Sequence, residues 1–278
     1  MNRLSRLGTL SVAMLMAMLP AVVVAEARNN AMILQSATSP ADAGLYDHIL
    51  PLFEKTSGIR VHVVAVGTGQ ALRNGRAGDG DVVLVHAKSQ EEKFVAEGYG
   101  VQRLDVMKND FVLAGPTADP ARVSDLSTAR AAFTAIAVSK SVFISRGDNS
   151  GTHDKELQIW KAANIDAASA SVTWYREIGA GMGVTLNVAA GLGGYTLTDR
   201  GTWINFRNKQ SLTLLLDGDA SLNNPYGVIL VNPERHPHVK AREGQAFINW
   251  LTSRSGQAAI AGYKINGRQL FFPNAQPQ

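Results

Sequence analysis

The chain has 278 residues, of which 45% are hydrophobic and 18% are charged, and its formal net charge is +4. This composition is typical of a soluble globular protein with one large domain or two ordinary ones, and the nearly balanced charge does not indicate a nucleic-acid or membrane surface. The absence of cysteine excludes disulfides, thiolate metal sites, thiol catalysis and a lipid anchor on cysteine.

The first 25 residues have the pattern of a secretory signal peptide. Arg3 and Arg6 make a basic start, and a mostly apolar stretch without charge follows from Leu7 to Val24. Small residues offer a cleavage site after Ala25, and Ala25-Glu26-Ala27 offers a second one. The apolar stretch contains Gly8, Thr9, Ser11 and Pro20 and is short for a membrane-spanning helix, so cleavage is expected rather than a retained anchor. We therefore expect an exported protein that is free in the periplasm.

Helix-like and strand-like patterns alternate through the first part of the remaining chain. Ser39-Pro40 predicts a helix start, with the serine as N-cap, and Gly58 predicts the end of that helix. The segment 81–86 (DVVLVH) is nearly continuously apolar, which is typical of a strand buried on both faces. The other elements expected here are a strand over 59–66, a short helix near 71–72, a helix over 89–97 and a strand over 111–114.

The same alternation restarts after Gly115-Pro116 and indicates an α/β architecture. The expected elements are a helix over 124–136, a strand over 142–145, a helix capped by Ser150 or Thr152, a helix over 184–192, strands over 195–198 and 226–231, and a final helix over 239–253.

The chain is expected to cross twice between two α/β lobes, near 110–116 and near 224–232. Residues 26–113 are then the first part of lobe I, residues 114–225 are lobe II, and residues 226–278 return to lobe I. Two lobes joined by two crossings make a hinge with a cleft.

Four loops rich in glycine and hydroxyl groups follow a strand or precede a helix. A helix N-terminus presents free N–H groups and partial positive charge to an anion, hydroxyl groups add donors, and glycine lets the backbone approach closely. One such loop is usually only a helix cap, whereas four of them, with arginine among their residues, predict an anion site at the carboxyl ends of strands. The loops are 36–39 (SATS), 67–70 (GTGQ), 145–153 (SRGDNSGTH) and 196–202 (TLTDRGT).

Arg146 is the sharpest candidate, because a guanidinium at the end of a strand can grip an oxyanion through two parallel hydrogen bonds. The alternative is a structural salt bridge with Asp148. Arg200 is a second candidate, for which a local ion pair with Asp199 is the simpler interpretation.

Several enzymatic and metal-binding interpretations find little support. Asp148, Ser150 and His153 lie close along the chain but match no nucleophile-elbow pattern, and catalytic triads assemble across a fold rather than within one loop. The six histidines include no pair at helical ligand spacing, and no nucleotide-binding fingerprint is present. No metal and no cofactor are therefore expected.

These loops, together with the rest of the mature chain, resemble the TupA-type tungstate-binding proteins of bacterial ABC transporters. The matching stretches run from about Met32 to Pro273 and include AVGTGQAL, GDVVLVHA, FISRGDNSGTHDKE and YTLTDRGTW. The resemblance implies a two-lobed type II periplasmic-binding-protein fold with two crossover segments and a ligand cleft. It also implies a non-catalytic protein that passes tungstate or molybdate to the transporter permease. We expect this protein to be a monomer.

The resemblance also implies which residues bind the anion. The first motif of the family is a run of three threonines and a serine, which here reads SATS, so that Ala37 has lost one hydroxyl. Lys108 stands near the first crossing where a tyrosine is expected. The implied oxyanion-binding residues are Ser36, Thr38, Ser39, Thr68, Gly69, Arg146, Ser150 and Thr152.

Other ligands and roles stay open at this point. Molybdate has the same charge and nearly the same size as tungstate, and sulfate and phosphate are further alternatives. Phosphate carries a proton at neutral pH and needs an acceptor, so a carboxylate of Asp148 or Asp199 facing the cleft would favour it. A secreted phosphatase or esterase is a distant alternative, and a sensor domain with a partner receptor is another.

Overall fold

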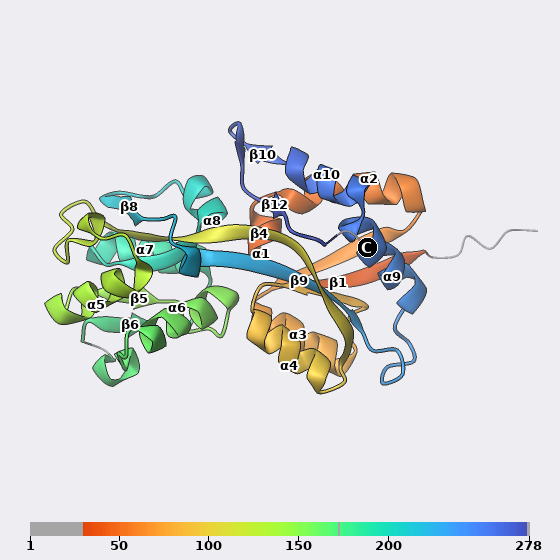
Figure 1. Cartoon of the computed structure of the whole chain (residues 1–278), viewed down its shortest axis with the longest axis horizontal. Coiled ribbons are helices and arrows are strands. Elements are labelled where there is room, and N and C mark those ends of the chain that lie inside the picture. Colours follow the sequence, from red (N-terminus) through yellow and green to blue (C-terminus); the bar gives the residue numbers. More distant parts are fainter. Residues whose placement is uncertain (1–29, 172, 277–278) are drawn as a thin grey trace, which may run out of the picture.

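The computed structural model describes residues 30–171 and 173–276 (Figure 1). The signal-peptide prediction falls on residues 1–25 and lies outside the described residues. Within the described ranges, no helix has both the length and the apolar character needed to cross a membrane. Two groups of elements are joined by two long strands that run side by side, β4 (Gly100–Pro116) and β9 (Asn223–Val231).

The main sheet has the strand order β12-β4-β9-β3-β1-β2. Its strand β1 pairs in parallel with β2 and β3, whereas β9 is antiparallel to both β3 and β4. The far end of β4 pairs with β7 and β8, so this one strand belongs to both groups of elements. The bounds are β1 (Ala31–Ala37), β2 (Arg60–Val66), β3 (Val82–Val85), β7 (Thr196–Asp199), β8 (Leu212–Leu216) and β12 (Phe272–Pro273).

Lobe I packs helices on both faces of this sheet. Alternate residues of β3 enter two different hydrophobic clusters, Val82 in one and Val83 in the other, which confirms the prediction of a strand buried on both faces. Phe53 and Phe247 pack in the first cluster, and Phe94 packs in the second. The elements are α1 (Thr38–Asp42), α2 (Leu45–Ser57), α3 (Thr68–Ala77), α4 (Lys88–Ala96), α9 (Ala241–Thr252), α10 (Arg254–Gly262), β10 (Lys264–Ile265) and β11 (Arg268–Gln269).

Lobe II has its own core, in which Phe133, Phe143 and Trp160 pack with ring centroids 4.4–5.3 Å apart. This core begins at Phe111 and ends at Leu222, and the core of lobe I resumes only outside these positions. The strands therefore pass between the lobes at 108–110 and 223–225. The elements are α5 (Ala129–Ser139), β5 (Phe143–Ser145), α6 (Gly151–Ala162), β6 (Tyr175–Glu177), α7 (Met182–Leu192) and α8 (Arg200–Asn205).

Helix ends account for most differences from the sequence-based expectations. The N-cap predicted at Ser39 is wrong, because α1 starts at Thr38 and the hydroxyl of Ser39 turns instead toward Tyr226. The helix then breaks at Gly44, whose φ of +78° is left-handed. The helix expected over 124–136 is a 3₁₀ turn followed by α5, which is capped by Thr128. The cap predicted at Ser150 is confirmed, since its side chain accepts a hydrogen bond from the N–H of His153.

Candidate oxyanion-binding site

A small cavity lies between the lobes, where the connections after β1, β2, β3, β5 and β7 meet the starts of several helices. The cavity volume is about 10 Å³, far less than the roughly 300 Å³ or more of pockets for organic ligands. Only a ligand of a few heavy atoms suits such a space. The lining residues are Ala37, Thr38, Ser39, Gly67, Thr68, His86, Arg146, Ser150, Thr152, Met182, Asp199 and Thr202.

Thr68 supplies an unused donor from lobe I. It is the first residue of α3 and is 1% exposed, and its Oγ1 has no hydrogen-bond partner among the described residues. A buried hydroxyl without a partner costs about 1–3 kcal/mol, so its position on the cavity wall indicates that a ligand completes it. Thr38 and Ser39 line the same wall from the start of α1.

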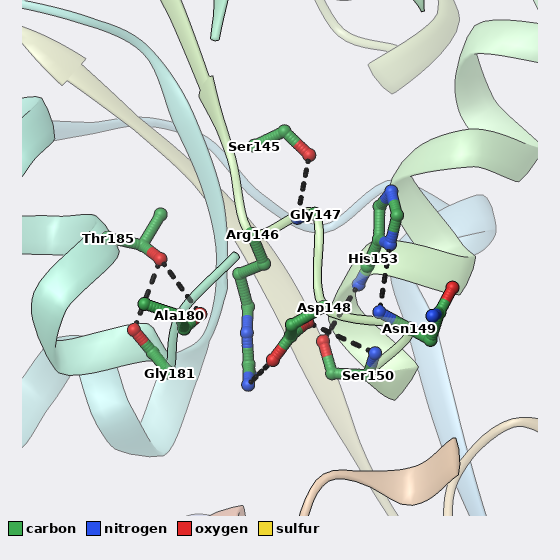
Figure 2. A network of polar contacts seen from close by, with 10 residues as sticks. All are labelled: Ser145, Arg146, Gly147, Asp148, Asn149, Ser150, His153, Ala180, Gly181 and Thr185. Atoms are coloured by element: carbon green, nitrogen blue, oxygen red, sulfur yellow. Dashed lines mark hydrogen bonds and ion pairs between the residues drawn. The ribbon is translucent and has the colours of Figure 1, made fainter. Parts of the chain in front are cut away.

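Arg146 supplies the positive charge from lobe II. Its side chain is 8% exposed and follows β5, and Nη2 donates to Oδ2 of Asp148 at 2.5 Å (Figure 2). The other carboxylate oxygen of Asp148 accepts the N–H of Ser150 at 3.1 Å, which fixes this pair to the start of α6. Nε of Arg146 is buried and has no partner among the described residues. The salt bridge and an anion contact are therefore compatible, because they use different nitrogens.

The start of α6 adds further donors beside the arginine. Ser150 Oγ accepts the N–H of His153 at 3.2 Å, which leaves the hydroxyl hydrogen of the serine for the cavity. Thr152 is 2% exposed and also lines the cavity. The partial positive charge at the start of this 12-residue helix favours a negative ligand.

Asp199 brings a carboxylate to the same cavity. It caps α8, with Oδ1 accepting the N–H of Thr202 at 2.9 Å and Oδ2 accepting the hydroxyl of Thr202 at 2.6 Å. Burial raises the pKa of this carboxyl above its ordinary value, although the bonds from Thr202 and the charge of Arg146 oppose the rise. The cavity thus combines one cation with one acceptor, which is the condition set above for phosphate.

His86 lines the cavity and was missed by the sequence-based prediction. Its ring stacks on Tyr226 with centroids 4.8 Å apart, and its Nδ1 lies 2.9 Å from Oδ1 of Asn224. Burial lowers the pKa of His86 to about 4, so the ring is neutral at pH 7. The available signal was its place directly after a buried strand, where ligands bind in α/β sheets. Met182 and Thr202 were missed as well, although Thr202 belongs to one of the four loops.

The structure brings together six of the eight predicted residues and leaves two outside the cavity lining. The hydroxyl of Ser36 contacts the hydroxyl of Tyr46 and donates to the carbonyl of Ala37 at 2.9 Å. Gly69 faces Asn149, whose carbonyl oxygen would lie 2.9 Å from a Cβ at this position.

The predicted ion pair between Arg200 and Asp199 is wrong. Arg200 instead binds Asp110 at 2.6 Å and Asp217 at 2.7 Å, because the start of α8 lies against β4. Arg200 does not line the cavity.

The Asp148, Ser150 and His153 cluster is not arranged as a catalytic triad. Ser150 accepts from the backbone of His153 rather than from its ring, and Nδ1 of the ring accepts the N–H of Asn149 (Figure 2). Asp148 is held by Arg146. The ring of His153 is therefore not placed to act as a base for Ser150.

Comparisons with known proteins agree with this geometry. A profile of the PBP superfamily domain matches residues 23–255. The tungstate-binding protein TupA of Peptoclostridium acidaminophilum is 43% identical over 247 residues, which cover 87% of this chain and 85% of that protein. The solved structure of the tungstate-binding protein TupA from Desulfovibrio alaskensis G20 is 44% identical with a TM-score of 0.76, covering 88% of this chain and 99% of that one.

A tungstate ABC transporter structure from Geobacter sulfurreducens is 47% identical with a TM-score of 0.76, and the match covers 84% of this chain and 98% of that one. The expected periplasmic-binding-protein fold is confirmed, and the matched proteins are solute-binding proteins rather than enzymes. This chain therefore belongs to the PBP superfamily and, within it, to the TupA family of tungstate-binding proteins.

Proposed function

We propose that this protein binds tungstate in the cavity between its lobes and delivers it to the permease of an ABC transporter. One observation carries the proposal: Thr68 Oγ1 and Arg146 Nε are buried donors without partners in the part of the chain that the structure describes, and both residues line one small cavity from opposite lobes. A tetrahedral oxyanion presents acceptors in several directions and can complete both donors at once. The names of the relatives support tungstate in particular.

The proposed location is the periplasm, which the signal-like pattern of residues 1–25 supports. Delivery to a permease follows from the family, and the proposed form is a monomer. If the protein supplies a transporter, cells without it should accumulate less tungstate from a dilute medium. Equal accumulation would contradict the transport role.

Hydrogen phosphate is a second candidate ligand, and Asp199 is the observation that favours it. A carboxylate oxygen on the cavity wall can accept the proton of hydrogen phosphate, which tungstate lacks at neutral pH. Both oxygens of Asp199 already accept from Thr202, so such a bond would use a remaining lone pair.

Isothermal titration calorimetry of residues 26–278 tests the proposal. Tungstate should bind with one-to-one stoichiometry, molybdate should compete, and sulfate and phosphate should not displace it. Tight binding of phosphate with no binding of tungstate would replace the first candidate with the second. No heat and no thermal stabilisation with any of the four anions would refute an oxyanion site.

A further inference from the structure

Two buried asparagines face each other where the strands pass between the lobes. Asn109 of β4 and Asn224 of β9 are direct partners in the antiparallel register, and they are 3% and 1% exposed. Nδ2 of Asn224 donates to Oδ1 of Asn109 at 2.6 Å. Side chains of β4 and β9 are thus joined by a hydrogen bond that is buried away from water.

This pair is the middle of a longer chain of hydrogen bonds whose two end residues line the cavity. On one side, Oδ1 of Asn224 lies 2.9 Å from Nδ1 of His86. On the other side, Nδ2 of Asn109 donates to the hydroxyl of Tyr226 at 3.3 Å, and that hydroxyl lies 2.8 Å from Oγ of Ser39. His86 and Ser39 both belong to the cavity lining.

The amide orientations fix the direction of this chain. Tyr226 is 0% exposed, and its oxygen accepts from Asn109, so its own hydrogen needs an acceptor. Oγ of Ser39 is the acceptor within reach, and a buried phenol without one costs about 1–3 kcal/mol. Tyr226 therefore donates to Ser39, and the hydrogen of Ser39 is left to point elsewhere.

We propose that Asn109, Asn224 and Tyr226 are positioning residues that orient the hydroxyl of Ser39 as a donor to the bound oxyanion. The inference rests on the proposed function, since it needs an anion in the cavity. If the hydrogen bonds ran in the reverse direction, Ser39 would donate its hydrogen to Tyr226. A lone pair of the serine oxygen would then face the anion. Only the observed direction gives an attractive contact.

The molecule contains a matched control for this arrangement. The hydroxyl of Tyr46 contacts Oγ of Ser36 in the same lobe, and both residues are buried, but neither lines the cavity. Replacing either tyrosine with phenylalanine removes one buried tyrosine–serine hydrogen bond. Tyr226→Phe should lose more thermal stability than Tyr46→Phe, because Asn109 also loses its acceptor, and only Tyr226→Phe should lose affinity.

A double-mutant cycle on tungstate affinity tests the proposal. Tyr226→Phe should weaken binding about fivefold, because the hydroxyl of Ser39 is no longer held as a donor. In a Ser39→Ala background the same change should have no further effect, and Tyr46→Phe should leave the affinity unchanged. Equal losses from the two phenylalanine variants, or additive losses from Tyr226→Phe and Ser39→Ala, would overturn the proposal.

The ring tautomer of His86 gives a second test that needs neither a ligand nor a stable Tyr226 variant. In the observed direction Asn224 presents a carbonyl oxygen, so the neutral ring must carry its proton on Nδ1. Nitrogen-15 NMR at pH 7, with the His86 signals assigned by their loss in His86→Gln, should show that tautomer. A proton on Nε2 would mean that the chain runs in reverse and would overturn the inference. A failure of wild-type protein to bind tungstate would instead refute the proposed function.

Discussion

The two walls of the cavity differ in charge. Lobe I contributes hydroxyl groups, the neutral ring of His86 and backbone at helix starts, none of which carries a formal charge. Lobe II contributes the cation of Arg146 and the carboxyl of Asp199. The contrast teaches that both charged groups facing the ligand come from lobe II, whereas lobe I supplies neutral donors.

The walls are also held in place differently. In lobe II the charged groups are fixed locally, Arg146 by Asp148 and Asp199 by Thr202, all within a few residues of sequence. In lobe I the hydroxyl of Ser39 is fixed through Tyr226, 187 positions along the chain. The charged wall is therefore held by contacts within lobe II. The neutral wall needs β9, the strand that brings the chain back to lobe I and carries Tyr226.

The largest expected loss of affinity follows from removing the positive charge of the lobe II wall. Arg146→Ala should weaken tungstate binding by about 100-fold, because charge-assisted hydrogen bonds contribute roughly 1.5–3 kcal/mol each. The affinity of Arg146→Lys should lie between those of the wild type and Arg146→Ala, since a lysine keeps the charge without the planar guanidinium group. Calorimetry measures both, with Arg130→Ala, an exposed arginine of α5, as the control. A loss for Arg146→Ala no larger than that for a single hydroxyl would contradict this division.

The second effect tests the acceptor on the charged wall. A bound dianion raises the pKa of Asp199 further, so binding takes up a proton and affinity falls as pH rises. The charged neighbours of Asp199 are Arg146, which opposes this rise, and Asp42, which reinforces it. Asp199→Asn should bind tungstate about tenfold more tightly at pH 8.5, because the repulsion between the carboxylate and the dianion is removed.

Dissociation constants at pH 6.5 and 8.5 are the measurement for Asp199. The asparagine variant should lose most of the pH dependence and should bind phosphate more weakly than the wild type does. An unchanged pH dependence would show that the carboxyl does not sense the anion.

The third effect is a loss of affinity on removing one hydroxyl from the neutral wall of lobe I. Thr68→Val keeps the shape of the side chain and removes its hydroxyl, so affinity should fall about fivefold, the contribution of one neutral hydrogen bond. Thermal stability should not fall, because Oγ1 has no hydrogen-bond partner within residues 30–171 and 173–276. Thr56→Val, at an exposed position of α2, is the control. If Thr68→Val lost stability but kept its affinity, the hydroxyl of Thr68 would bond to another protein group rather than to the ligand.

The smallest effect on binding is expected from a carboxyl in the core of lobe II. Burial raises the pKa of Glu156 to about 7, and Tyr175 and Trp160 donate to its Oε1 at 2.9 and 3.1 Å. Between its ordinary pKa and about 7, the folded protein keeps a proton that the unfolded chain has released. Stability therefore falls as pH rises through this window.

Glu156→Gln keeps the acceptor and removes this pH dependence, so at pH 8 it should be roughly 1–3 kcal/mol more stable than the wild type. Urea unfolding at pH 5 and pH 8 measures the change, and tungstate affinity should stay the same. Parallel stability curves for the two proteins would show that Glu156 is ionised in the fold.

The sequence was a good guide wherever a local pattern determines the structure. The apolar run of β3 and the Ser150 cap follow from neighbouring residues alone, and both are confirmed. The full length of β4 was underestimated, because residues 100–110 are held by pairing with β9, more than 100 positions away. The ion pair of Arg200 was missed for the same reason, since its partner Asp110 lies on β4, 90 positions away from the start of α8.

The candidate site shows the same limit. Loops with local anion-binding chemistry supplied six cavity residues, and sequence alone could not tell Ser36 from Ser39, although both carry the same hydroxyl. The difference lies in which tyrosine each one meets, Tyr46 or Tyr226, and this depends on packing across the lobe. His86 was missed because a single histidine after a strand has no distinctive spacing.

The position of β9 between β3 and β4 has a consequence for the order of assembly. All the strands of lobe II come from one continuous stretch, whereas β3 and β4 each leave an edge unpaired until residues 223–231 have been made. Pairings across such long stretches form slowly, because the loop must close before any contact compensates for it. We therefore expect lobe II to fold early and lobe I late, so that the half carrying Arg146 takes shape before the half carrying Thr68.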